Sequence, residues 1–245
     1  MNKVKKLVGV KRFAFTLAEV LITLGLIGVI AAMTLPTLNA GINKRVIETR
    51  LKADYSFIQQ VLKKAEASDV VIGADVSNNL ESVKNYFESA IQPNMKYSNV
   101  CIKSRGCWHD GVTYNLAGRQ AYCDKPGIGI GYDIITINLL NGSTIVMDWY
   151  GKQSVRNYFG VDIETNNTIT IFIDANGKKP PNVVGKDIYA LVNTPDGLVP
   201  AGMSVSKEEV DKNCSKSASG NNAGYYCLRR VKENNWKIPD DIWGK

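Results

Sequence analysis

Two hydrophobic patterns follow one another near the start of the chain. Residues 13–43 are uncharged except for one carboxylate, Glu19. Beyond them, apolar residues recur at spacings of three and four, as on one face of a helix; they are Ile47, Leu51, Tyr55, Ile58, Leu62 and Ala65. Together the patterns predict one long helix with an apolar half, residues 15–43, and an amphipathic half, residues 44–67.

The apolar half is long enough to cross a membrane. Residues 20–43 carry no charge, and as a helix they span about 36 Å at roughly 1.5 Å per residue. Gly28 and Ala32 have a small-xxx-small spacing that lets membrane helices approach closely. We therefore expect this half to lie in a membrane and contact other helices, and the amphipathic half to lie against a globular head.

The head, residues 68–245, changes to strand-like patterns after a short predicted helix at 77–92 and a loop-rich region at 93–127. Residues 132–140 and 143–150 flank Asn141-Gly142, a strong hairpin signal. Further strands are predicted at 168–174, 187–192 and 198–200. Because turns join consecutive strands, the sheet should be antiparallel. The predicted fold class is therefore α+β, with the long helix packed on an antiparallel sheet.

Residues beyond 200 predict an appendage to this sheet. Ser206 and Glu209 have the spacing of a capping box, which would open a short helix ending near Cys214. A second helix is predicted at 225–234. The last residues, 236–245, are expected to be extended and anchored by Trp236 and Trp243.

Glu19 is the first candidate for a functional residue, because a carboxylate in a bilayer-length apolar helix is costly and needs a partner. It ends the sequence KRFAFTLAE, residues 11–19, which follows a leader without acidic residues. This arrangement resembles the processing site of type IV prepilins and type II secretion pseudopilins, with Ala14 where the family usually has Gly. A secretory signal peptide differs, because its apolar region is removed with the leader.

The resemblance implies a role for each part. Residues 1–14 would be a leader that a prepilin peptidase removes between Ala14 and Phe15, and Phe15 would then be N-methylated. The new Phe15 amine would pair with the Glu19 of a neighbouring subunit, and Pro36 corresponds to the family's helix-interrupting proline. The chain would be a structural subunit without enzymatic activity, with a pilin-like fold, that polymerises with other pilin or pseudopilin subunits through its N-terminal helix. Both a type IV pilus and a type II secretion pseudopilus fit.

Charge predicts the orientation in the membrane. The net charge of +7 includes five basic residues of the leader, without which 25 basic and 23 acidic residues remain. A general attraction to nucleic acid is therefore not supported. Because Lys and Arg beside a membrane helix stay in the cytoplasm, the protein should cross the inner membrane once with a cytoplasmic N terminus. The head would be periplasmic, or extracellular after filament assembly.

All five cysteines lie beyond the apolar half, in a compartment where disulfides persist. We favour two local bridges, Cys101 to Cys107 and Cys214 to Cys227, which leave Cys123 over. Sequence alone does not prove this connectivity, and five reduced, packed cysteines are the alternative. No pair has the CxxC spacing, and His109 is the only histidine, so a zinc site or a Cys-His nucleophile is poorly supported.

The sequence gives no further sign of cofactor chemistry or catalysis. Asp174, Asn176 and Asp187 supply oxygen atoms near a turn and would suit calcium, but their spacing departs from the EF-hand pattern. Asn-Gly between strands is more often a turn, so no metal is expected. The alternative to a pilin-like subunit is a membrane-anchored periplasmic enzyme or binding module whose signal anchor is not cleaved.

Overall fold

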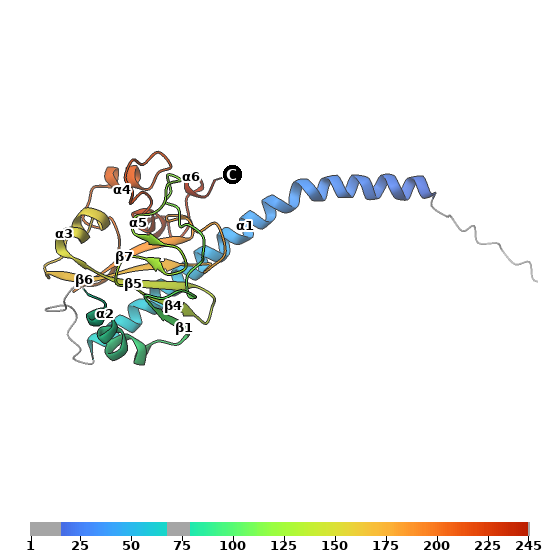
Figure 1. The fold of residues 1–245 in the computed structure, drawn as a ribbon. Coiled ribbons are helices and arrows are strands. Elements are labelled where there is room, and N and C mark those ends of the chain that lie inside the picture. Colours follow the sequence, from blue (N-terminus) through green and yellow to red (C-terminus); the bar gives the residue numbers. More distant parts are fainter. Residues whose placement is uncertain (1–15, 68–78, 245) are drawn as a thin grey trace, which may run out of the picture. The chain divides into compact units, whose positions relative to one another are not determined.

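The computed structural model describes residues 16–67 and 79–244, and residues 35–42 by their backbone alone. The chain divides after Asn43 into an N-terminal unit and a larger C-terminal unit that starts at Lys44. Helix α1, Leu17–Glu66, contributes to both units (Figure 1). Its bounds agree closely with the single long helix predicted over residues 15–67.

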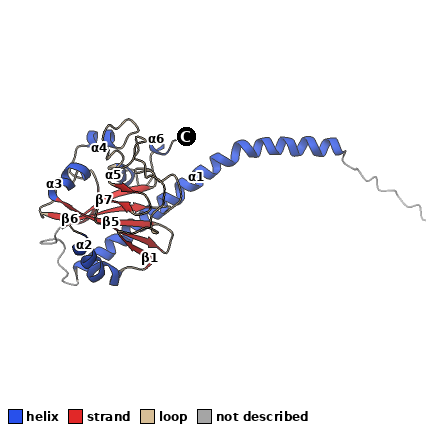
Figure 2. Ribbon diagram, viewed as in Figure 1, coloured by secondary structure: helices blue, strands red, loops and turns tan. Residues whose placement is uncertain are grey.

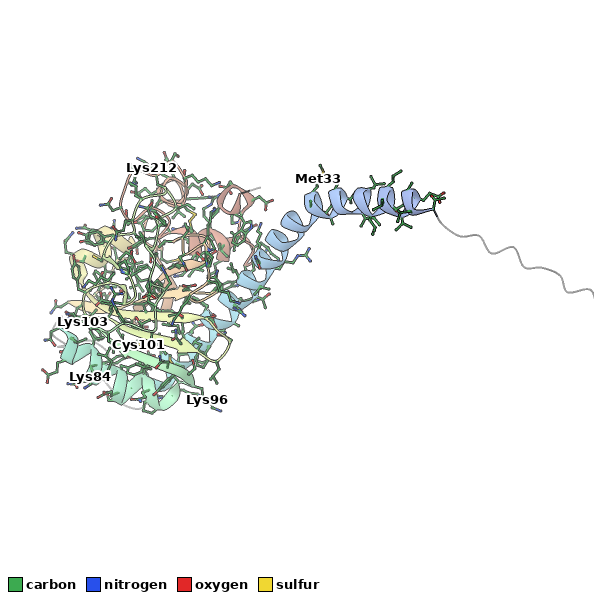
Figure 3. The ribbon with its side chains drawn as sticks, turned by 45° about the vertical axis from the view of Figure 1, so that its right-hand side comes forward. Met33, Lys84, Lys96, Cys101, Lys103 and Lys212 are labelled. Carbon is green, nitrogen blue, oxygen red and sulfur yellow. A yellow bond between two sulfur atoms is a disulfide. The ribbon has the colours of Figure 1, made fainter. Side chains whose placement is uncertain are left out.

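In the N-terminal unit the described residues form the apolar half of α1. The stretch Leu17–Thr34 is long and apolar enough to cross a membrane, and none of it is buried within the chain. Its large apolar side chains are exposed on every side, from 43% at Val20 to 79% at Leu17. Met33, 73% exposed, projects from the helix in Figure 3. The apolar side chains of Leu17–Thr34 are therefore not packed into a hydrophobic core of the described residues.

The C-terminal unit is built on an antiparallel sheet of six strands (Figure 2). The spatial order is β1-β4-β5-β6-β7-β8. The strand bounds are β1 Tyr97–Ile102, β4 Ile135–Leu139, β5 Thr144–Gly151, β6 Asn167–Asp174, β7 Ile188–Thr194 and β8 Gly197–Pro200. Five of these strands correspond to predicted ones. β1 lies in the region predicted as loop-rich, because Ser98 and Asn99 are polar and exposed and only Cys101 of its six residues is buried.

Both faces of the sheet are buried, which explains why its central strands read as nearly continuous apolar runs. Alternate residues of β5 and β6, including Met147 and Ile171, join the core that contains Leu51 and Ile58 of α1. The residues between them, Val146 and Phe172, join a second core that contains Tyr225 and Tyr226. One face thus packs on the amphipathic half of α1, and the other is covered by C-terminal segments.

The amphipathic half of α1 is bonded to the head as well as packed on it. All six residues of its predicted stripe are buried. The Tyr55 hydroxyl donates to the Leu198 carbonyl oxygen at 2.6 Å, and the Tyr55 ring packs against Trp236 with centroids 5.1 Å apart. Glu48, 6% exposed, accepts from Lys237 Nζ and from the Ile238 backbone N–H, each at 3.0 Å. These bonds tie the helix to the C-terminal segment.

The C-terminal appendage is partly helical. Helix α4, Lys207–Asn213, begins with the predicted capping box of Ser206 and Glu209. Helix α5, Cys227–Glu233, is the second predicted helix. The prediction that residues 236–245 are extended was wrong, because Asp240–Trp243 forms the short helix α6. Trp236 and Trp243 nevertheless pack against the α1-side core as expected.

Smaller elements complete the head. Helix α2, Leu80–Tyr86, continues into a π-helical turn, Phe87–Ile91, and a 3-10 turn, Gln92–Asn94, so the helical stretch ends two residues beyond the predicted range of 77–92. A second hairpin pairs β2, Asp124–Lys125, with β3, Gly129–Ile130. Helix α3, Lys152–Ser154, leads into another π-helical turn, Val155–Phe159. In Figure 3, Lys84 and Lys96 lie at one end of the head and Lys212, on α4, lies at the other.

Candidate functional site at the start of the N-terminal helix

Thr16 and Glu19 form a reciprocal hydrogen-bonded pair at the first turn of α1. The Thr16 backbone N–H and the Thr16 hydroxyl both donate to Glu19 Oε2, each at 2.8 Å. The Glu19 backbone N–H donates to Thr16 Oγ1 at 3.2 Å. This is a capping box, which satisfies backbone donors that have no partner inside the helix. Thr16 therefore fixes where the helix starts.

The capping box was missed in the sequence, although its signature, Thr16-x-x-Glu19 before an apolar run, is present. The partner that the sequence suggests for Glu19 is the amine of Phe15. Ala14 and Phe15, the predicted processing residues, lie outside the described residues. Both bonds from Thr16 reach the same oxygen of Glu19, and none of the described residues bonds Glu19 Oε1. The carboxylate can thus cap its own helix and keep one oxygen for a second partner.

The polar side chains inside the apolar stretch are satisfied by their own helix. Thr23 Oγ1 donates to the Glu19 carbonyl oxygen at 2.9 Å, and Thr34 Oγ1 donates to the Ile30 carbonyl oxygen at 3.0 Å. A hydroxyl left without a partner in an apolar medium would cost several kcal/mol. These bonds remove that cost, and Glu19 is the one charged side chain within Leu17–Thr34.

The predicted helix-contact residues lie on the same exposed surface. Gly28 and Ala32 are one turn apart and both are exposed. A Cβ atom added at Gly28 would meet no atom of the chain within 4 Å. Within a single chain nothing therefore requires glycine here. Pro36 lies inside α1, and its side chain is outside the described part of the structure.

The cysteines form the two bridges that the sequence favours. Cys101 bonds Cys107 and Cys214 bonds Cys227, with Cα atoms 5.8 and 4.9 Å apart. The first bridge closes the turn after β1, and the second joins the end of α4 to the start of α5. Cys123 is unbridged and half-buried. Both bridges therefore act locally in the head.

His109 lies in the interior of the head. Its Nε2 is 3.0 Å from Thr113 Oγ1, which also accepts from Trp108 Nε1 at 3.2 Å. Burial lowers the pKa of His109 below its ordinary value, against the opposing effect of Asp124. His109 is thus built into a buried hydrogen-bond network.

The residues considered for calcium lie together at the turn between β6 and β7. Asp174 is the last residue of β6, and Asp187 directly precedes β7. Both carboxylates are fully buried, and each affects the other's charge. In the described part of the chain no group of three or more His, Cys, Asp or Glu side chains could hold a metal. Any cation here would need amide oxygens as well as carboxylates.

Comparison with protein-family models, curated proteins and solved structures found no match to this chain. Arguments about its function therefore start from its own residues.

Proposed function

We propose that the chain is a prepilin-like structural subunit that a prepilin peptidase processes between Ala14 and Phe15 and that polymerises through α1. The observation that carries the proposal is the stretch Leu17–Thr34, apolar on every side and unburied in the chain, with one carboxylate in its first turn. The resemblance of residues 11–19 to the prepilin processing site supplies the class. The assembly would be a type IV pilus or a type II secretion pseudopilus.

The geometry at Thr16 supports processing at the predicted bond. Helix α1 begins at Leu17, with Thr16 as its cap. The bond between Ala14 and Phe15 precedes this cap. Removal of the leader would place the new Phe15 amine next to the first turn, where Glu19 carries the negative charge. In a membrane neither charge has water, so pairing between subunits would stabilise both.

Mass spectrometry of the N terminus tests processing. When the full chain is expressed with an active prepilin peptidase, we expect it to begin at Phe15 and to carry one N-methyl group. An Ala14→Leu control, with a bulky residue before the cut, should enter membranes but keep its leader. Wild-type protein that keeps residues 1–14 beside an active peptidase would instead support the rival function, an enzyme or binding module on an uncleaved anchor.

Gly28 offers an independent test of polymerisation. Gly28→Leu adds a side chain where the single chain leaves open space, so insertion and the stability of the head should not change. If helices of neighbouring subunits approach at this surface, the larger side chain should lower the filament fraction. Ile22→Leu, at an exposed position of the same helix, introduces leucine without changing the side-chain volume and serves as the control. Normal assembly of Gly28→Leu would remove Gly28 from the contact surface.

A further inference from the structure

One end of the C-terminal unit lies close to the membrane if Leu17–Thr34 spans it. Lys44 begins this unit and follows Thr34 by ten positions of the same helix. At about 1.5 Å per residue, the helix between them is no longer than about 15 Å. The headgroup layer fills about 5–8 Å of this distance, and the remainder is about one Debye length. Charges beside Lys44 can therefore act on lipid headgroups.

Segments from the C-terminal part of the chain lie beside the start of the amphipathic half (Figure 1). Lys44 forms an ion pair with Asp240, the first residue of α6. One turn further along α1, Glu48 accepts from Lys237 Nζ, and the Lys237 side chain remains 66% exposed. Arg45 lies between these two contacts in the sequence and is exposed. The region around Lys44 thus presents basic side chains to the solvent.

Two lysines from other segments extend this basic surface. Lys216 Nζ lies 3.5 Å from the Cβ position of Gly244, the residue that directly follows α6. The charges of Lys216 and Lys186 act on each other. The four basic side chains at this end of the unit, here called the basic rim, are Arg45, Lys186, Lys216 and Lys237.

The basic rim carries positive charge that the described residues do not balance. Arg45, Lys186 and Lys216 form no ion pair with a described Asp or Glu. Asp187, next to Lys186 in the chain, is 0% exposed, and its oxygens accept bonds from backbone N–H groups. The other acids at this end already have basic partners: Glu48 pairs with Lys237, Asp240 with Lys44 and Asp241 with Arg230. The rim therefore attracts an anionic partner.

We propose that the basic rim binds the phosphate groups of anionic phospholipids in the membrane that holds Leu17–Thr34. Basic residues beside a membrane helix favour an anionic surface, each by about fivefold in affinity. Apolar side chains at this end fit the same partner, since Val46 is 39% exposed and Trp243 of α6 is half-buried. Tryptophan is common at the level of the headgroups. The proposal needs the insertion of Leu17–Thr34, which the proposed function shares, but neither cleavage nor polymerisation.

The rim fits a lipid surface better than a nucleic acid. Its cations lie around the start of a helix half that continues from the apolar stretch, so an anionic membrane would meet them without a diffusing partner. The 25 basic and 23 acidic residues beyond the leader do not predict a broad basic face for a nucleic-acid backbone. Contact with lipid would hold the head against the membrane surface.

Hydrogen exchange of the full chain tests this contact, in lipid nanodiscs that hold one copy each and so exclude polymerisation. In discs with about one third phosphatidylglycerol, amides 237–244 should exchange about fivefold more slowly than in pure phosphatidylcholine, because lipid contact hinders the opening of this short terminal segment. About 0.5 M NaCl should remove the difference by screening. Amides of α2, Leu80–Tyr86, serve as the internal reference and should exchange alike in both lipids.

A pair of double variants locates the contact. Arg45→Gln with Lys216→Gln removes two rim charges and should reduce the slowing to less than about twofold. Lys63→Gln with Lys84→Gln removes the same charge elsewhere and should behave as wild type. Lys63 is 18 positions along α1 from Arg45, a distance of about 27 Å. Lys84 is on α2, which lies beside the end of α1 in Figure 1.

The outcomes separate this proposal from its alternatives. Equal exchange of amides 237–244 in the two lipids would overturn it, and so would a slowing that the rim variant retains. If a short DNA duplex slows these amides in pure phosphatidylcholine discs and phosphatidylglycerol does not, the rim is a nucleic-acid site instead. Mass spectrometry of the N terminus reads out leader cleavage independently, so each of the two proposals can fail without the other.

Discussion

The two halves of α1 are both helical, but for different physical reasons. In Lys44–Glu66 most apolar side chains form one stripe that is buried in the core of the head, and Val46, 39% exposed, lies outside it. In Leu17–Thr34 they lie on all sides, and none is buried. Burial of apolar surface stabilises a fold by about 25 cal/mol per Å². The second half gains this within its own chain, whereas none of the first half's apolar surface is buried in the described part of the chain.

Polar groups differ between the halves in the same way. In the second half, Glu48 is paired with Lys237 and Ile238 of its own chain. In the first half, Glu19 is bonded to Thr16 through one oxygen. Glu48 is therefore a structural residue of the head. Glu19, whose second oxygen accepts no bond from the described residues, is suited to pairing with another molecule. The comparison therefore separates a half that is part of the folded head from a half whose apolar surface is unburied.

The sharpest contrast between the halves should come from equivalent leucine substitutions. Leu51 is 0% exposed and Leu24 is 60% exposed. Leu51→Ala should lower the free energy of unfolding of the head by about 2–5 kcal/mol, because it leaves a cavity. Leu24→Ala should leave that free energy unchanged. Denaturant unfolding of both proteins in detergent, followed by tryptophan fluorescence, measures the difference; equal losses would erase the distinction between the halves.

The disulfides belong to the folding side of the comparison. Cys214 and Cys227 are separated by 13 positions, and Cys101 and Cys107 by 6. Chain entropy predicts that replacing the longer bridge by two alanines costs about 3 kcal/mol, and replacing the shorter one about 2 kcal/mol. Thermal unfolding ranks the two double variants. Membrane insertion should be normal in both, and a failure to insert would show that the head and the apolar half are not independent.

Asp148 gives the stability of the head a pH dependence. Burial raises its pKa to about 6, although the Tyr132 and Trp149 backbone N–H groups donate to its oxygens at 3.0 and 2.8 Å. The folded state therefore binds this proton more tightly than the unfolded state, whose pKa is about 4. The resulting stabilisation, on the order of 3 kcal/mol, is complete below about pH 4 and lost as the pH rises through 6.

Thermal unfolding midpoints of the head, measured from pH 3.5 upward, test this effect. Each unit of pKa difference corresponds to about 1.4 kcal/mol of stability. Asp148→Asn should be less stable overall, because its amide faces a backbone donor, but its midpoint should fall less with rising pH than that of wild type. Asp187 contributes to the same window through its own pKa of about 6. Parallel profiles for wild type and Asp148→Asn would mean that Asp148 stays charged throughout.

Much of this fold was predictable because strong local patterns coincide with the tertiary contacts. The stripe through Leu51 and Ile58 is buried, and the Asn141-Gly142 hairpin joins β4 to β5. Strand β1 was missed because Ser98 and Asn99 are exposed at the sheet edge, so that alternation is weak. Helix α6 was missed because a helix of four residues is too short to show a helical repeat of apolar positions. Its first residue, Asp240, is also held by an ion pair with Lys44, which is far away in the sequence.

The candidate sites were predictable to different degrees. Glu19 stands out in the sequence as a lone charge, and its bonds to Thr16 follow the Thr-x-x-Glu signature of a capping box. Asp174 stands near a turn in the sequence, yet only the folded loop shows that it is buried with one carboxylate oxygen unpaired among the described residues. Patterns of residue type reveal an unusual charge; they do not reveal which hydrogen bonds remain unmade.

Two substitutions separate the roles of Glu19. Glu19→Ala removes both the cap and the charge, and we expect it to be inserted and cleaved but to enter filaments poorly. Thr16→Ala removes the hydroxyl from the capping box and keeps the charge, and should cost the helix about 1 kcal/mol with little loss of assembly. Filament yield in sheared fractions compares them. Equal defects in the two variants would mean that capping alone explains the effect.

The measurement that tests the assembly role most directly is the ratio of filament to membrane-bound subunit for Glu19→Gln. Glutamine can accept the same bonds from Thr16, as it does in capping boxes, and has no charge for a neighbouring Phe15 amine. We predict normal insertion and cleavage, with a filament ratio about tenfold below wild type, the effect of losing about 1.4 kcal/mol. A Glu19→Gln protein that is cleaved and assembles at the wild-type ratio would contradict the proposal that the charge of Glu19 joins one subunit to the next.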